Sequence, residues 1–410
     1  MTIFGEKESE VATLLTVVAR RDLDRDGVRD NFGRALWSSI AEPGDRMAGL
    51  AVAFLGAARA LDVVMEKTPA KEVAAALRDA GSPEITDVDV AKALARWEPR
   101  LQPTSALAAL RRAERIGARL LVPGSTGWPD SLDDLELHAP MALWCRGTDA
   151  ALSALPGSIA LVGARAATGY GEHVTMEASA GLVDRGYAIV SGAAYGIDGM
   201  AHRAALASHG ITVAFLAGGV DRFYPSGHDA LLERIAQTGA VLSEMPCGEP
   251  PTKWRFLQRN RLIAAASQAT VVMEAGWRSG SLNTAGHAAT LGRALGAVPG
   301  PITSAASAGC HRLIREFDAV CVTTVDEMAE LAPRGPGERT AMTSSGTVAV
   351  QTELVPLNVR VLDALSARSP RSSTDVAARS GLAVASVQSA LGTLALEGRV
   401  VEKQQGWLLT

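Results

Sequence analysis

The hydrophobic pattern divides the chain into a helical first part, a middle part of strands and helices, and a small helical end. Up to about residue 118, apolar residues recur at spacings of three and four, which is typical of helices that bury one face. The runs with this spacing are Val11–Val18, Met47–Val64, Val73–Leu77, Val90–Leu94 and Leu107–Ile116. Asp45 and Thr104 are predicted to cap the helices that follow them. Arg59 and Asp62 interrupt the longest apolar run, which therefore predicts a buried helix and no membrane span.

From residue 158 the pattern changes to short apolar runs, each followed by a polar or glycine-rich turn and then a helix. Apolar runs without alternation are typical of parallel strands that helices cover on both faces. The predicted strands are Ile159–Val162, Ala188–Val190, Thr212–Leu216, Ala240–Leu242 and Ala269–Met273, after an earlier short strand that ends at Gly147. In such a sheet the ligand site lies beyond the carboxyl ends of the strands, where the glycine-rich turns are found.

The last part of the chain begins after a stretch rich in Pro, Gly and Ser, which predicts a linker over residues 334–352. Three short helices are predicted at 359–365, 373–379 and 384–396, followed by a hairpin of residues 399–402 and 407–409. Three helices and a hairpin in so short a stretch are typical of a winged-helix module. The predicted domains are therefore residues 1–120, 121–333 and 353–410.

Composition and charge limit the possible partners. The 410 residues carry a formal net charge of −4, so a nucleic-acid contact requires a local basic patch. The four cysteines have no Cys-x-x-Cys spacing, which argues against a structural zinc site and a disulfide framework. The N-terminus has no signal-peptide profile. We expect a cytoplasmic protein without a membrane partner.

The segment Lys253–Arg261 is the main candidate for such a patch. It holds four cations, the rings of Trp254 and Phe256, and no acid. Arg and Lys neutralise phosphates, and exposed aromatic rings stack on unpaired bases. The same composition also fits the start of a helix with solvated cations and core aromatics. Composition alone leaves both interpretations open.

Two turns have features of anion sites. Gly163–Gly171 resembles a phosphate-binding loop at a helix N-terminus, with Arg165 inside it, although a plain tight turn with an exposed Arg is the alternative. It is not Gly-x-Gly-x-x-Gly, and no acidic residue follows the second strand, which disfavours a dinucleotide oxidoreductase. In the turn Ser279-Gly280-Ser281, small hydroxyl residues bind phosphate or cap a helix. The adjacent Arg278 favours anion contact.

Candidate catalytic groups are few. Asp198 and His202 lie four apart on a predicted helix and could form an acid–base or metal pair, or Asp198 could cap the helix. No third ligand is evident, so no metal or cofactor is predicted. The sequence has no Walker loop, no Gly-x-Ser-x-Gly and no His-Glu-x-x-His. A sheet whose turns are candidate anion sites, without a recognisable set of catalytic residues, favours binding over catalysis.

Taken in order, the motifs of residues 122 to 331 resemble the DprA/Smf family of DNA-processing proteins. These motifs are Val162-Gly163-Ala164-Arg165, Thr168-x-Tyr170-Gly171, Ser191-Gly192-Ala193-x-x-Gly196-Ile197-Asp198, Tyr224-Pro225, Ser243-Glu244, Lys253-x-x-Phe256-x-x-Arg259-Asn260-Arg261, Ser279-Gly280-Ser281-Leu282-x-Thr284 and Pro299-Gly300. The resemblance implies an α/β fold with an extended Rossmann-like, mostly parallel sheet, an N-terminal helical (SAM-like) domain and a C-terminal winged-helix domain. One departure is Ala164, where the family usually has Ser, which removes a hydroxyl donor.

The function that the resemblance implies is not enzymatic. It is sequence-independent binding of single-stranded DNA by a homodimer that loads RecA during natural transformation. The candidate DNA-binding residues are Gly163, Arg165, Lys253, Phe256, Arg259, Asn260, Arg261 and Arg278. The predicted recognition helix of the winged-helix module, Val384–Glu397, contains no Lys or Arg, which favours a protein contact or a structural role.

Two other functions remain as alternatives. A nucleotide or nucleoside phosphoribohydrolase-like enzyme would use the same scaffold, but it would need a Pro-Gly-Gly-x-Gly-Thr turn followed by Glu. The chain instead offers Glu274-Ala275-Gly276 and Ser279-Gly280-Ser281. A transcriptional or DNA-bending module led by the winged helix is disfavoured by the uncharged recognition helix.

Overall fold

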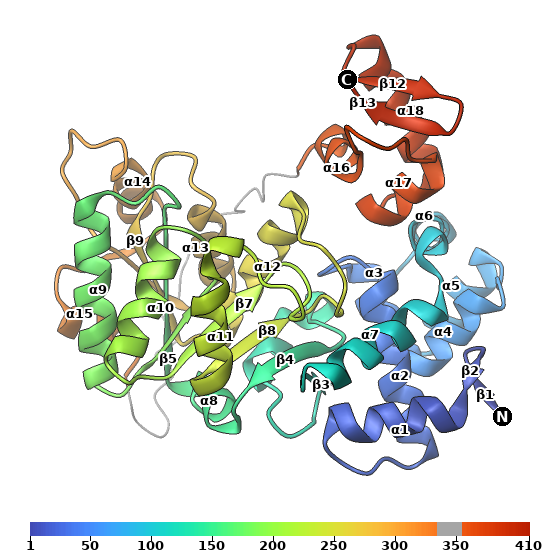
Figure 1. The fold of residues 1–410 in the computed structure, drawn as a ribbon, viewed down its shortest axis with the longest axis horizontal. Coiled ribbons are helices and arrows are strands. Elements are labelled where there is room, and N and C mark those ends of the chain that lie inside the picture. Colours follow the sequence, from blue (N-terminus) through green and yellow to red (C-terminus); the bar gives the residue numbers. More distant parts are fainter. Residues whose placement is uncertain (334–354) are drawn as a thin grey trace.

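The computed structural model describes residues 1–333 and 355–410. Figure 1 shows N-terminal helices at one end of the molecule, a large sheet with helices on both faces at the other, and the C-terminal elements beside the N-terminal helices. The predicted linker, residues 334–352, lies outside the described residues.

The N-terminal part is helical and begins with a short hairpin. The hairpin strands are β1 (Thr2–Ile3) and β2 (Glu6–Lys7). The helices are α1 (Glu8–Ala19), α2 (Arg25–Ile40), α3 (Arg46–Leu55), α4 (Ala57–Met65), α5 (Ala70–Asp79), α6 (Asp87–Trp97), the 3₁₀ helix η1 (Glu98–Arg100) and α7 (Pro103–Arg115). In their core, the rings of Trp37 and Trp97 pack edge to face with centroids 5.0 Å apart. Edge-to-face packing adds to the stabilisation that burial alone gives.

Two details of these helices differ from the prediction. The apolar run from Met47 to Val64 forms two helices, because Gly56 adopts φ 80° between α3 and α4. Asp45 caps α3 as predicted, accepting from the amides of Met47 and Ala48. Thr104 was wrongly predicted to be a cap: α7 begins one residue earlier, at Pro103, whose fixed φ suits the first helical position.

Within residues 1–333 and 355–410, no single helix is long and apolar enough to cross a membrane. The pair α3 and α4 passes that test only when taken together, and the two helices are bent by 112°.

The central sheet has nine strands in the order β11-β10-β9-β5-β6-β7-β8-β4-β3. Its strands are β3 (Arg119–Leu121), β4 (Leu143–Gly147), β5 (Ser158–Gly163), β6 (Ala188–Ser191), β7 (Thr212–Leu216), β8 (Ala240–Ser243), β9 (Ala269–Glu274), β10 (Ala294–Ala297) and β11 (Val320–Cys321). All neighbours pair in parallel except β3 with β4 and β4 with β8. The predicted mostly parallel sheet is therefore confirmed.

Helices cover both faces of this sheet. They are α8 (Asp149–Ser153), α9 (Gly169–Asp184), α10 (Ile197–Ala207), α11 (Asp229–Thr238), α12 (Lys253–Ala266), α13 (Ser281–Thr290), α14 (Ala308–Glu316) and α15 (Val325–Glu330), with the 3₁₀ helices η2 (Asp130–His138), η3 (Leu155–Gly157) and η4 (Ser226–His228). Along β5, Ile159 and Leu161 pack into the core under α9 and α10, whereas Ala160 and Val162 pack under α12 and α13. Because side chains alternate along a strand, burial on both faces produces the continuous apolar runs of the sequence.

The strand order reverses between β5 and β9. The chain runs from β5 through β6, β7 and β8 in one direction, and β9 then returns to the other side of β5. Loops at such a reversal leave the sheet in opposite directions at the carboxyl ends of the strands, which is where ligands of open α/β sheets bind. This position places the loops after β5 and β9 next to each other, and the amide of Ala164 donates to the carbonyl of Glu274 at 2.8 Å.

The C-terminal part has the predicted three helices and a hairpin. They are α16 (Leu357–Ala364), α17 (Ser373–Ser380), α18 (Val384–Leu396), β12 (Val400–Lys403) and β13 (Gly406–Leu409). Apolar residues of all three helices and the hairpin form a separate core. This part contacts the rest of the molecule through α16 on α12 and α17 on η1.

Candidate nucleic-acid interface

The loop after β5 is held in place by the buried carboxylate of Glu274. This carboxylate accepts hydrogen bonds from the Thr168 amide at 2.8 Å and the Thr168 hydroxyl at 2.6 Å. At Gly163 a β-carbon would lie 2.6 Å from Ile197 and 2.8 Å from the Glu274 carbonyl, so only Gly fits. The loop is thus fixed at both ends, and Arg165 between them is exposed.

The loop after β6 packs directly on this first loop. Gly196 adopts φ 74°, and a β-carbon there would overlap the carbonyl of Ala164. The amide of Ile197 donates to the same carbonyl at 3.2 Å. Positive φ favours Gly, and the missing side chain allows the close approach of the two loops.

Helix α12 contributes the basic segment, and its cations have different environments. The Lys253 side chain is 71% exposed. Arg259 is buried and donates to the carbonyls of Gly192, at 2.6 Å, and Phe215. It thereby joins α12 to the ends of β6 and β7. Burial lowers the pKa of Arg259 to about 10, so it remains a cation at neutral pH.

Arg255 and Arg261 are also buried, and both form ion pairs. Arg261 lies 2.8 Å from the carboxylate of Glu244 and donates to a carbonyl of η2. Arg255 pairs with Glu42 at 2.9 Å and with Glu249 at 2.8 Å. Burial acts to lower the pKa of Arg255, but the two carboxylates raise it above its ordinary value. Both guanidinium groups are therefore buried and already paired with carboxylates.

The most accessible part of the site is a cluster of one cation and two rings, in which Arg165 and Tyr224 are exposed and Phe256 is partly buried. The Arg165 guanidinium carbon lies 5.0 Å from the Phe256 ring centroid, and the Tyr224 and Phe256 centroids are 5.5 Å apart. Arg165 and Phe256 thus meet although they come from distant segments. Tyr224, which is 50% exposed, belongs to the Tyr224-Pro225 motif but was not predicted to be a contact. Its position after a predicted strand was the available signal.

Asn260 links α12 to the turn after β9, where Arg278 lies. The Asn260 amide group donates to the Gly280 carbonyl at 3.3 Å and to the Asn283 side chain at 3.2 Å. Arg278 is exposed on this turn, next to Trp277, which is 57% exposed and lies 5.2 Å from Arg312. Trp277 was not predicted to be a site residue. Exposed cations and rings thus follow more than one strand of the sheet.

Asp198 and His202 have separate partners. Asp198 accepts from the Ala194 amide at 3.3 Å, and burial raises its pKa. Burial lowers the pKa of His202 to about 3, and its Nδ1 lies 2.7 Å from the Thr212 hydroxyl. The prediction that Asp198 caps α10 was wrong, because Gly196 occupies the cap position.

Comparisons with known proteins agree with this fold and with the order of the motifs. Residues 119–333 match the model of the family described as DNA recombination-mediator protein A, and residues 347–406 match the DprA winged helix domain. The architecture and the matches define a DNA-processing protein with a winged-helix end. The chain belongs to the DNA recombination-mediator protein A family, which is the DprA/Smf family.

Individual relatives support the assignment. The chain is 45% identical over 303 residues to a putative DNA processing protein DprA of Mycobacterium tuberculosis, covering 72% of this chain and 77% of that protein. It is 41% identical over 192 residues to protein Smf of Escherichia coli, covering 47% and 50%. The X-ray structure of DNA processing protein A from Streptococcus pneumoniae superposes with a TM-score of 0.56 at 28% identity, covering 72% and 94%.

Proposed function

We propose that this family member binds single-stranded DNA without base preference, and that as a homodimer it delivers the strand to RecA. The observation that carries the proposal is the stack of Arg165 on Phe256, 5.0 Å apart, at the carboxyl ends of the strands. A phosphate-binding cation and a base-stacking ring are the two groups that sequence-blind binding of unpaired strands requires.

Each group of the site has a distinct role in this proposal. Arg165, Lys253 and Arg278 contact phosphates, while Phe256 and Tyr224 offer faces to successive bases. Stacking contributes about 1–3 kcal/mol per base and accepts every base, because every base has a π face. Duplex DNA keeps its bases stacked inside, so the rings favour single strands.

The remaining candidate residues support the exposed ones. Arg259 and Asn260 fix α12 against neighbouring loops, and Arg261 anchors α12 to Glu244. Gly163 lets the Arg165 loop lie close to Ile197 and β9. In this proposal the loop amides reach a phosphate together with Arg165, since backbone amides at a helix start attract anions. Membership in a family described as recombination mediators supports a role in recombination.

The test replaces the central cation. Arg165→Ala should weaken binding to oligo-dT and to a mixed-sequence oligonucleotide alike, by about tenfold or more, since one charge-assisted contact contributes about 1.5–3 kcal/mol. The slope of log affinity against log salt should become shallower by about 0.7, the value for one phosphate on a single strand. Fluorescence anisotropy measures both quantities.

The matched control is Arg234→Ala, which removes an exposed Arg from α11, outside the cluster. Its affinity and salt slope should equal those of the wild type. Equal affinities for Arg165→Ala and the wild type would reject this site. ATP hydrolysis by RecA on the same oligonucleotides, with and without each variant, reports whether strand binding is coupled to RecA loading.

A further inference from the structure

The winged-helix module packs on the first turn of α12, where Lys253 lies. The Asp363 carboxylate contacts this lysine twice: it lies 3.2 Å from the ammonium, and it accepts from the Lys253 amide at 3.1 Å. Next to this contact, the guanidinium of Arg360 lies 4.8 Å from the ring of Trp254. The Asp363 carboxylate of the C-terminal module is therefore paired with a cation that, in the proposed function, contacts a phosphate.

Asp363 lies at the end of its helix where an acidic residue is unfavourable. Asp363 is the second-last residue of α16. A carboxylate in the last turn of a helix interacts unfavourably with the helix dipole. The helix α16 therefore does not stabilise the Asp363 carboxylate, whereas the ammonium and the amide of Lys253 do. The acid complements α12 rather than α16.

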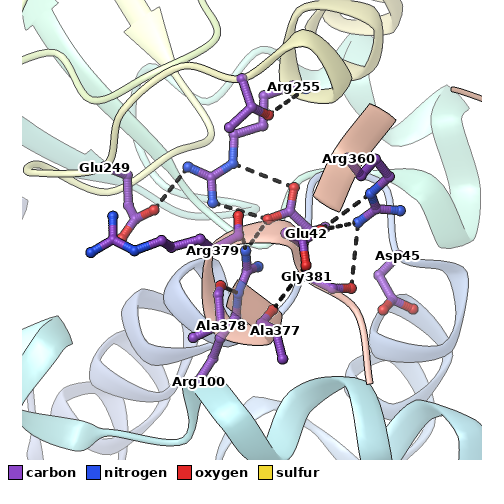
Figure 2. Close-up of polar contacts among 12 residues, drawn as sticks. Glu42, Asp45, Arg100, Glu249, Arg255, Arg360, Ala377, Ala378, Arg379 and Gly381 are labelled. Atoms are coloured by element: carbon purple, nitrogen blue, oxygen red, sulfur yellow. Dashed lines mark hydrogen bonds and ion pairs between the residues drawn. The ribbon is translucent and has the colours of Figure 1, made fainter. Parts of the chain in front are cut away.

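A second set of contacts holds the same module to the body, and these contacts are buried. Figure 2 shows Glu42 between the guanidinium groups of Arg100, Arg255 and Arg360. Arg100 pairs with Glu42 and donates to the carbonyls of Ala378 and Arg379 at the end of α17. Its side chain is 6% exposed. We call these contacts the Glu42 anchor.

The two sets of contacts differ in how easily they can open. The Lys253 side chain is exposed, and exposed ion pairs contribute little to stability and weaken with salt. The anchor is shielded from solvent, and its charges have no water to replace their partners. An anion that approaches Lys253 can therefore replace Asp363 while the Glu42 anchor stays closed.

We propose that the winged-helix module is an internal competitor of DNA: Asp363 pairs with Lys253 until a phosphate of the strand replaces the Asp363 carboxylate. This inference rests on the proposed function. It assigns the module a regulatory contact with α12, and it needs no Lys or Arg on the helix Val384–Leu396. Binding of the strand then opens the contact between Asp363 and Lys253, while the Glu42 anchor stays closed.

The first experiment compares Asp363→Ala with Glu402→Ala by anisotropy on single-stranded oligonucleotides. Both variants remove one carboxylate from the winged-helix module, and Glu402 is exposed on β12, away from the α12 contact. Asp363→Ala should bind about two- to fivefold more tightly than the wild type, the range expected when an exposed ion pair no longer competes. Glu402→Ala should bind as the wild type does.

The second experiment follows hydrogen exchange in the wild-type protein. Adding oligonucleotide should speed exchange in residues 357–364 and at the Lys253 amide if the contact opens. Slower exchange in residues 357–364 would mean that the module joins the DNA contact, which overturns the inference. If the wild type binds DNA and Asp363→Ala gains nothing, competition is rejected while the proposed function stands. If the wild type does not bind, the proposed function itself fails.

Discussion

Lys253, Arg255, Arg259 and Arg261 lie within nine residues, yet they have different structural roles. Lys253 is exposed, whereas the three Arg side chains are buried with carboxylates or carbonyls as partners. A guanidinium group can be buried because its five donors can be satisfied in a fixed geometry. A basic segment in a sequence therefore gives the number of cations but not the number that solvent or DNA can reach.

A substitution of Arg261 tests whether a buried cation of this segment stabilises the fold or contacts DNA. Arg261→Ala leaves the Glu244 carboxylate buried without its cation, and we expect a loss of about 3–5 kcal/mol in the free energy of unfolding. Urea denaturation measures the loss, with Arg234→Ala as the control that changes stability little. The folded variant should keep most of its affinity for single strands. A large loss of affinity with unchanged stability would show instead that Arg261 contacts DNA.

How far the sequence predicts the site depends on where the partners come from. The adjacent loops were predictable, because parallel strands bring the turns after Val162 and Met273 to one edge of the sheet. The burial of Arg255 was not, because its partner Glu42 lies 213 positions away and no local pattern connects the two. The role of Asp363 was hidden for the same reason.

At the scale of elements, the apolar pattern predicted most strands of the central sheet and most helices, and it failed where backbone conformation overrides the pattern. The run Met47–Val64 has helical spacing throughout, so its period does not show the break at Gly56. The strands β10 and β11 were missed because they are short and contain no long apolar run. Gly56 was the one local signal of the bend between α3 and α4.

Gly56 leads to a prediction about backbone strain. Its φ of 80° and ψ of 153° lie in a region that only Gly adopts easily, while a β-carbon there would meet no atom within 4 Å. Gly56→Ala should therefore cost about 1–3 kcal/mol through backbone strain alone. Gly392→Ala, in the middle of α18 and also in open space, should be neutral or stabilise by up to about 1 kcal/mol. Chemical denaturation followed by circular dichroism measures whether the two substitutions change the free energy of unfolding in opposite directions.

At the scale of the whole molecule, Glu42 joins the three parts of the chain. It lies between α2 and α3, and its partners come from η1, α12 and α16. Burial acts to raise the pKa of Glu42, but the charges of Arg100, Arg255 and Arg360 lower it to about 2. A group whose folded pKa lies below its ordinary value of 4.5 stabilises the fold fully above pH 4.5. That contribution is lost as the pH falls from 4.5 towards 2.

Glu42→Gln removes the charge that three guanidinium groups share, with little change in shape. We expect a loss of about 3–5 kcal/mol at pH 7, because the remaining cations are buried and repel one another. The winged-helix module should separate from the body, so the radius of gyration from small-angle scattering should increase. The stability difference between the variant and the wild type should shrink below pH 4.5, where Glu42 of the unfolded wild-type chain begins to be protonated while the folded carboxylate stays charged.

Glu249→Gln is the control from the same cluster. Glu249 pairs with Arg255 but is 40% exposed, so its loss should cost less than about 1 kcal/mol and leave the radius unchanged. Asp363→Ala should also keep the module attached, because it opens only the exposed contact and leaves Arg100 and Glu42 paired. If Glu42→Gln kept the wild-type radius at pH 7, hydrogen bonds and apolar packing would be sufficient to hold the module. The charge of Glu42 would then serve the N-terminal helices and α12 alone.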